Sequence, residues 1–266
     1  MKTLSDINKK HNRKQELERY LKNKKYPDYV KTLEEMVSDP KTKALVEEGF
    51  GGDLGDIQLK FSEKTISVKR LLPTQNEISL ESSLKHCLVN KETISKFLDG
   101  EGIVTKFPLV TFNENYVIDG HHRWSEVFII NPKAKMVCVN YNGDMSPIQM
   151  LKATQGAIAA STGDVPESKR KGQDIYSIDE DDIRKYIDET ITDDVIDIFV
   201  NKIFDIDNKE DVVDYLVDNC LQLKNDYPPI KYAPDRELMP QTDTAGTPKD
   251  KGSALNRMKK DKVLKI

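Results

Sequence analysis

The sequence has few cysteines and no long apolar run. Its three cysteines, Cys87, Cys138 and Cys220, are odd in number and widely spaced, and they form no C-x-x-C motif. This pattern excludes a disulfide framework and favours buried, reduced thiols in a reducing cytoplasm. No segment approaches eighteen consecutive apolar residues, and the N-terminus lacks the apolar core of a signal peptide, so we expect no contact with a membrane.

A strong excess of one charge is also missing. Lysine and arginine number 41 against 45 aspartate and glutamate, which gives a net charge of -4. A chain of this balance does not coat nucleic acid with its whole surface, although a local basic patch remains compatible with it. The length of 266 residues suits one ordinary domain with extensions, or two small domains.

Proline and glycine divide the chain into segments. Residues 1–50 predict a helical N-terminal extension, and the glycine-rich stretch 49–55 that follows lacks the spacing of a phosphate-binding loop, so it marks a boundary. Residues 57–160 alternate in the order β–α–β–β–α–β–α. The fold class that we predict is α+β, a small mixed-sheet domain with helical regions on both sides.

Within this central domain the elements have definite start and stop signals. We expect a strand over 66–72, a helix over 91–98 that Asn90 caps and Gly100 ends, a hairpin of 108–112 with 116–118, a helix over 121–130, a strand over 135–141 and a helix from Ser146-Pro147 to about residue 160.

Two further regions follow the central domain. Residues 177–223 predict an acidic helical module, in which Ser177, Thr192 and Asn208 begin the helices and the acidic surface repels phosphate backbones. Residues 224–266 form a proline-rich tail with a basic end, and we expect it to be extended or disordered. A protein partner would bind through the helical extensions or this tail.

The stretch with the most chemical potential is Tyr116–Trp124. An apolar strand leads into Asp119-Gly120, and His121, His122 and Arg123 then open an amphipathic helix. A strand–glycine–helix junction directs free backbone N–H groups and the positive helix end at one point, which predicts an anion site. Trp124 belongs to the core face of the helix. Because adjacent residues in a helix point about 100° apart, one histidine is expected to be functional, with His122 favoured, and the other structural.

Two stretches together resemble a known family. Ser67-Val-Lys-Arg-Leu-Leu-Pro-Thr-Gln-Asn-Glu77 and the Asp-Gly-His-His-Arg motif at 119–123, with Pro108-Leu-Val before it, resemble the ParB/sulfiredoxin superfamily. The resemblance is strongest to the ParB-like nuclease domains of bacteriophages and covers about residues 57–145. Members of this superfamily hold phosphate groups at the strand-to-helix turn. A phage-encoded chain would act in the host cytoplasm or in the virion.

The resemblance implies a role for each matching residue. Gly120 would let the backbone approach phosphates, while Arg123, His121 and Gln75 would bind them. His122, Asp119 and Glu77 would be catalytic, and Asp119 either holds Mg²⁺ or caps the helix. ATP or CTP would be the nucleotide.

This chain also departs from its suggested relatives. The reactive cysteine of sulfiredoxins is replaced by His121, which excludes reductase chemistry, and the DNA-reading helices of partition proteins are not recognisable. The serine kinases have a glutamate after the first strand, where this chain has Gln75 and then Glu77.

Two functions remain open from the sequence. The first is a phosphate-handling domain that binds a nucleotide or nucleic acid and carries out Mg²⁺-assisted phosphoryl transfer or phosphodiester hydrolysis, as a ParB-like nuclease or a nucleotide-dependent phosphotransferase. The second is a non-enzymatic phage protein, virion-associated or scaffolding, that retains the fold.

Overall fold

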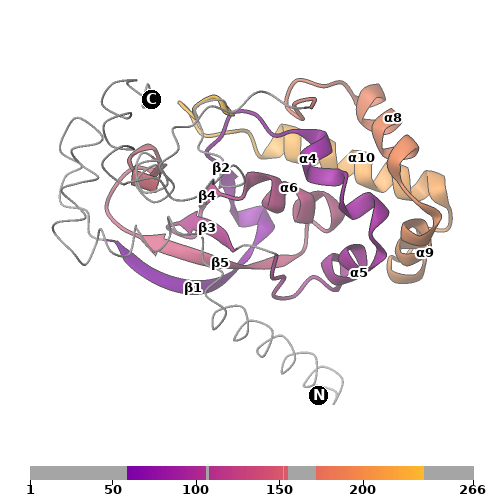
Figure 1. Ribbon diagram of the computed structural model, residues 1–266, viewed down its shortest axis with the longest axis horizontal. Helices are drawn as coiled ribbons and strands as arrows, with labels where there is room; N and C mark the ends of the chain where they lie inside the picture. Colours follow the sequence, from indigo (N-terminus) through magenta and orange to yellow (C-terminus); the bar gives the residue numbers. More distant parts are fainter. Residues whose placement is uncertain (1–58, 106–107, 152, 155–171, 237–266) are drawn as a thin grey trace, which may run out of the picture.

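A mixed five-stranded sheet carries the α+β fold that the sequence predicts. The structure is a computed structural model that describes residues 59–105, 108–151, 153–154 and 172–236. The strands lie in the order β1-β5-β3-β4-β2, and both parallel and antiparallel pairs occur among them. Their bounds are β1 Lys60–Ser67, β2 Leu72–Pro73, β3 Leu109–Phe112, β4 Tyr116–Asp119 and β5 Lys135–Asn142 (Figure 1).

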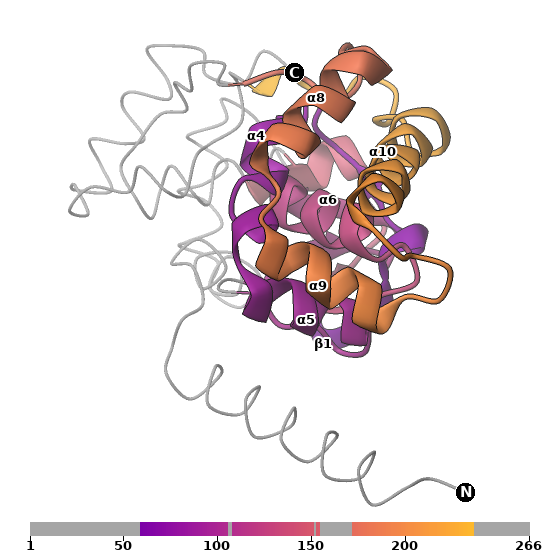
Figure 2. The ribbon, with the colours of Figure 1, turned by 90° about the vertical axis from the view of Figure 1, so that its right-hand side faces the viewer.

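Helix α6 lies in the middle of the helical layer (Figure 2). The helices around it are α4 Leu80–Leu84, α5 Lys91–Asp99, α8 Glu180–Thr190, α9 Asp193–Lys202 and α10 Lys209–Asp226, and α6 itself spans His121–Ile130. One hydrophobic cluster extends from Ile66 in β1 to Leu223 in α10. Asn219 of α10 also donates a 2.8 Å hydrogen bond to the carbonyl of Ile129. The acidic helices therefore share their core with the sheet.

Several local signals produce the predicted elements. The Asn90 side chain accepts from the Thr93 backbone N–H at the start of α5, and Gly100 ends the helix with a φ of 75°. Strands β3 and β4 form the expected hairpin through residues 113–115, in which Asn113 and Glu114 both have positive φ, as the two central residues of a type I′ turn require. The Asn208 side chain caps α10 in the same way as Asn90 caps α5. These predictions are confirmed.

The expected strand over 66–72 is wrong because the chain crosses between the two sheet edges there. β1 and β2 occupy opposite edges, and the 3-10 turn Val68–Arg70 joins them. The backbone N–H of Val68 donates to the carbonyl of Ala134, and its carbonyl accepts from the Trp124 indole, both at 3.0 Å. The N–H of Val68 thus continues the register of β1 with β5, which begins at Lys135, whereas its carbonyl is satisfied by Trp124 of α6 instead of by a strand partner.

Two helix starts also differ from the prediction. Helix α4 was not expected, although Ser79 caps it by accepting from the Ser82 N–H. Helix α8 begins after Asp179, whose carboxylate accepts from the Asp182 N–H at 2.9 Å, instead of at Ser177. Aspartate competes well with serine at a helix start because its charge also interacts favourably with the helix dipole.

Residues 227–236, at the beginning of the tail, contain no α-helix or strand, as an extended segment would, but they pack on the domain, and Pro234 and Arg236 are buried. The predicted N-terminal extension, the end of the helix that Ser146 begins and the basic end of the tail lie outside the described residues. The three cysteines are buried and unpaired as predicted. None of the described helices is long and apolar enough to span a membrane.

Candidate functional site

Gly120 makes the turn between β4 and α6 possible. Its φ of 96° is in the left-handed region, where residues with a Cβ are strained. A Cβ at this position would lie 2.6 Å from Nη2 of Arg123 and 2.9 Å from Cδ1 of Leu109. The glycine therefore lets the Arg123 side chain fold back over the turn.

We expect Gly120→Ala to lower the free energy of unfolding by about 1–3 kcal/mol, because it adds backbone strain and displaces Arg123. Urea denaturation measures the change. Gly102→Ala is the matched control, since Gly102 also has a positive φ of 64° but lies outside this turn. A Gly120 variant no less stable than the Gly102 variant would contradict the crowding at Arg123.

His121 ties the loop after β2 to the start of α6. Its side chain is 3% exposed, and its Nε2 accepts a 3.1 Å hydrogen bond from the backbone N–H of Thr74. The Thr74 hydroxyl donates to the carbonyl of Val117 at 2.6 Å. Burial lowers the pKa of His121 to about 4, with a smaller lowering from the charge of Arg123. The ring is therefore neutral at pH 7, as an accepting Nε2 requires.

His122 makes the same kind of contact at the other end of this loop. Its Nε2 accepts from the backbone N–H of Ser79 at 3.2 Å. Burial, followed by the charges of Arg236, His121 and Arg123, lowers its pKa to about 3. The two histidines thus fix the loop 74–79 against α6, where we expected two different roles. The Nε2 atom of each histidine accepts a hydrogen bond from the loop, so it cannot at the same time donate one to a phosphate.

Asp119 and Arg123 form an ion pair across the turn. Nη2 of Arg123 lies 2.9 Å from Oδ2 of Asp119 and also donates to the carbonyl of Pro108 at 3.2 Å. The two side chains are only 18% and 21% exposed, respectively. This pairing orients the guanidinium of Arg123. It also means that the Asp119 carboxylate, which was predicted to hold Mg²⁺, is paired with the Arg123 guanidinium. Within the described ranges no group of three or more His, Cys, Asp or Glu side chains could hold a metal ion.

The loop from β2 brings Gln75 and Glu77 beside the turn. Strand β2 pairs in parallel with β4, with Leu72 opposite Tyr116 and Pro73 opposite Val117. Both Gln75 and Glu77 are buried, and the Gln75 amide donates to the carbonyl of Glu77. The structure therefore brings the two stretches of the predicted site together, but it gives the Gln75 amide a partner inside its own loop.

Two charged residues near this turn were missed. Glu126 lies one helical turn after Arg123, and burial raises its pKa to about 7, while Arg123 and a hydrogen bond with Cys87 lower it. Its spacing of four residues from His122 was the signal that could have identified it. Arg236 is buried, and its charge acts on His122. No local pattern in the tail indicates that this arginine returns to the turn.

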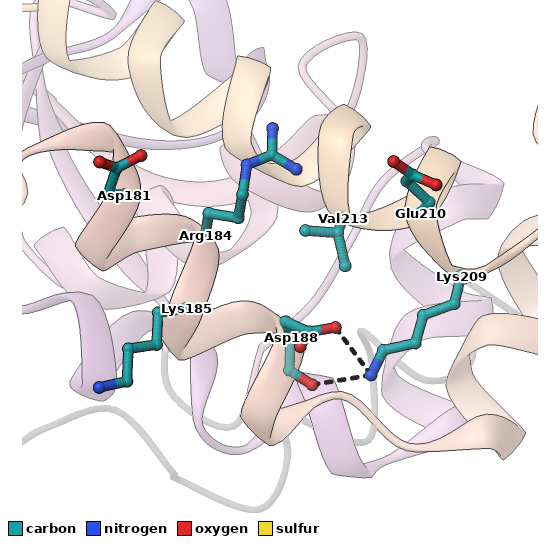
Figure 3. Close-up of a pocket in the computed structure, with 7 residues that line it drawn as sticks. All are labelled: Asp181, Arg184, Lys185, Asp188, Lys209, Glu210 and Val213. Carbon is teal, nitrogen blue, oxygen red and sulfur yellow. Dashed lines mark hydrogen bonds and ion pairs between the residues drawn. The ribbon is translucent and has the colours of Figure 1, made fainter.

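A groove lies between α8 and α10 (Figure 3). This groove of about 520 Å³ is lined mainly by charged side chains: Asp181, Arg184, Lys185, Asp188, Lys209 and Glu210, with Val213. Lys209 pairs with Asp188 at 2.8 Å, and Arg184 pairs with Asp214 at 2.6 Å. The groove shares no residue with the turn at α6.

Comparisons with protein-family models, curated proteins and solved structures found no match to this chain. The ParB/sulfiredoxin resemblance accordingly stays a prediction that rests on the motif residues themselves.

Proposed function

We propose that this protein binds the phosphate groups of a nucleotide or nucleic acid at the first turn of α6. The observation that supports this most directly is the uncapped start of α6 beside a guanidinium. Gly120 offers no side chain to the first N–H groups of the helix, and the first turn contains no acidic residue. Arg123 is folded back over the same turn. An anion would satisfy these N–H groups and interact favourably with the helix dipole.

The start of α6 differs from the starts of the other helices in how its first N–H groups are capped. Side chains of Ser79, Asn90, Asp179 and Asn208 cap α4, α5, α8 and α10. The start of α9 has no side-chain hydrogen bond at its cap, but Asp193 and Asp194 supply negative charge in its first turn. Among the α-helices with given bounds, α6 alone has neither a side-chain hydrogen bond from its N-cap residue nor an acidic residue within its first turn, and the carboxylate of Asp119, which precedes Gly120, is paired with Arg123. A bound phosphate would supply both hydrogen-bond acceptors for the first N–H groups of α6 and negative charge at its start.

The contacts favour binding over acid–base catalysis by His122. A ring whose pKa is about 3 is neutral at pH 7 and too weakly basic to take up a further proton readily, and its Nε2 is engaged by the loop. A magnesium site is not preformed, because Asp119 is paired with Arg123 and no three-ligand group exists in the described part of the chain.

The non-enzymatic alternative is favoured by one specific feature. Both imidazoles hold the loop 74–79 in place, so two of the most reactive side chains in the motif have a structural contact. A phage structural protein that keeps the fold would retain these contacts without turnover. Measuring phosphate release from ATP and CTP, and cleavage of single-stranded DNA, separates the two functions once binding has been established.

Binding is tested by titrating the protein with ATP, CTP and a short single-stranded DNA, with Mg²⁺ or with EDTA. Trp124, the single tryptophan, follows Arg123 directly and serves as a fluorescence reporter. We expect at least one ligand to bind and Arg123→Ala to weaken it by about 1.5–3 kcal/mol, which is about tenfold or more.

Arg184→Ala is the matched control, because Arg184 pairs with an acid on α10 and lies outside the turn. It should bind as the wild type does. Wild-type protein that binds none of the three ligands, or an Arg123→Ala variant with unchanged affinity, would refute phosphate binding at this turn.

A further inference from the structure

The two helices that border the groove, α8 and α10, carry an excess of negative charge. Together they contain ten acidic and four basic side chains, and none of these side chains is buried. The difference, ten minus four, is six negative charges on one side of the molecule. A surface of this kind attracts a cationic partner.

The cations that line the groove do not prevent such a partner from binding. Lys209 is paired with Asp188, and Arg184 is paired with Asp214. Figure 3 shows that the amine of Lys185 points away from the other side chains of the lining. The positive charges of the groove are therefore either neutralised by an acid or directed out of it.

Asp181 and Glu210 give the groove one carboxylate from each helix. Both line it, and neither forms an ion pair with another described residue. Val213 is the apolar residue of the lining, and the aliphatic stems of Arg184 and Lys209 add further apolar surface. The groove therefore suits a ligand in which cations stand next to apolar groups.

The basic end of the tail has this chemistry. Residues 255–265, with the sequence LNRMKKDKVLK, contain five cations and one acid, and four apolar residues stand among them. The net charge of this stretch is +4, opposite in sign to that of α8 and α10. Its composition matches the groove in both charge and apolar content.

The connection to the domain is long enough for this stretch to reach the groove. Arg236 is the last described residue, and the hydrogen bonds of Ile230 with Pro73 and of Asn76 with Pro234 fix the segment before it to the domain. The eighteen residues 237–254 follow. A fully extended chain of that length spans about 60 Å. The 18 residues of α10 correspond to a helix only about 27 Å long.

We propose that residues 255–265 bind in the groove between α8 and α10 of the same molecule and pair their cations with Asp181 and Glu210. Exposed ion pairs are individually weak, but a tether of this length gives the segment an effective concentration in the millimolar range, so a weak contact is sufficient. The contact is independent of phosphate binding at α6, because the groove shares no residue with that turn.

Carbodiimide cross-linking of the full-length protein identifies the partner of the tail, since it joins an amine to a carboxylate where the two are in contact. Mass spectrometry of the digested product locates the links. We expect links from Lys259 or Lys260 to Asp181 or Glu210. Their yield should fall when the salt concentration is raised to about 1 M, where the Debye length is only about 3 Å.

Thermolysin cleavage before Leu255 measures how well the groove protects the tail. In the variant Asp181→Lys with Glu210→Lys the tail sequence is unchanged, and we expect cleavage to be about fivefold faster, as the loss of two exposed ion pairs implies. The matched control is Asp197→Lys with Asp226→Lys, which makes the same change of charge at two exposed acids outside the groove. It should be cleaved at the wild-type rate.

An exchange of charges separates a direct contact from general attraction. The tail variant Lys259→Glu with Lys260→Glu should be cleaved as fast as the groove variant, and the protein that carries all four substitutions should recover most of the protection. The tail variant alters only residues outside the described fold, so its result does not depend on how the groove variant folds.

Several outcomes would overturn the inference. One is equal cleavage of the wild type and the groove variant, and another is equal acceleration in the groove variant and its matched control. Links from lysines of residues 1–50 to the groove would assign it to the N-terminal extension instead. Links found only between isotopically distinct chains in a mixed sample would assign it to a second copy.

Discussion

Lowering the pH from 7 to 3 is expected to destabilise the folded protein by about 5 kcal/mol through three side chains at α6. His121 and His122 have pKa values of about 4 and 3 in the folded protein, below their ordinary value of 6.5. The unfolded chain therefore binds more protons than the folded protein below pH 6.5. Their contribution to stability is fully present above that pH and is lost as the pH falls towards 3.

Glu126 acts in the opposite direction. Its pKa of about 7 lies above the ordinary value of 4.5, so the folded protein binds the extra proton between these values. Its contribution is fully present below pH 4.5 and is lost as the pH rises through 7. From pH 6.5 to 4.5 the two histidines thus act against one glutamate, and the net loss of stability is about 1.4 kcal/mol per pH unit. Below pH 4.5 the histidines act alone, and the loss becomes steeper until His121 is protonated.

Two variants identify the side chains responsible. In Glu126→Gln the opposing contribution is absent, so the decline between pH 6.5 and 4.5 should be about twice as steep as in the wild type. In His122→Gln an amide oxygen can still accept from the Ser79 N–H, but the side chain does not titrate. Its stability should decline less at low pH. Urea unfolding at several pH values measures both slopes, and wild-type slopes in both variants would show that these groups do not determine the acid response.

The sequence predicts elements best where a local signal is sufficient. Asn90 with Gly100, the Asn113 turn and Asn208 each act on the backbone within a few residues, so they determined their boundaries regardless of the remaining chain. The strand at 66–72 failed because its end depends on the sheet order. The carbonyl of Val68 turns away from the sheet to accept from the indole of Trp124, which is more than fifty residues away.

The candidate site shows the same division between local and distant causes. The motif predicted the helix start and the nearby position of the loop 73–77. It could not predict that both histidines accept from this loop, because the partners Thr74 and Ser79 are more than forty residues away. It also gave no sign of Arg236. Composition indicated that the tail cannot form a core of its own. A short segment can nevertheless pack on a domain that offers it hydrogen-bonding groups, and composition does not reveal such a surface.

Trp124→Ala is expected to lower the free energy of unfolding by about 3–5 kcal/mol, which is typical of a large aromatic residue removed from a core. The side chain is fully buried, and its ring lies 5.8 Å from that of Phe128. The substitution also leaves the carbonyl of Val68, at the crossover between the sheet edges, without its indole donor. Thermal and urea unfolding followed by circular dichroism measure the loss, because the variant has no tryptophan fluorescence.

Trp124→Phe separates the two contributions. It keeps an aromatic ring against Phe128 and Tyr227 but removes the N–H donor, so we expect a smaller loss of about 1–3 kcal/mol. If the two variants lose equal stability, the hydrogen bond to Val68 and not ring burial accounts for the role of Trp124. The alanine variant should also loosen the segment 227–236, since one of the two rings that Tyr227 packs against is gone and only that of Phe128 remains. Limited proteolysis after position 226 would then be faster than in Trp124→Phe, and equal rates would show that Asn76 and Pro73 hold the segment without the aromatic anchor.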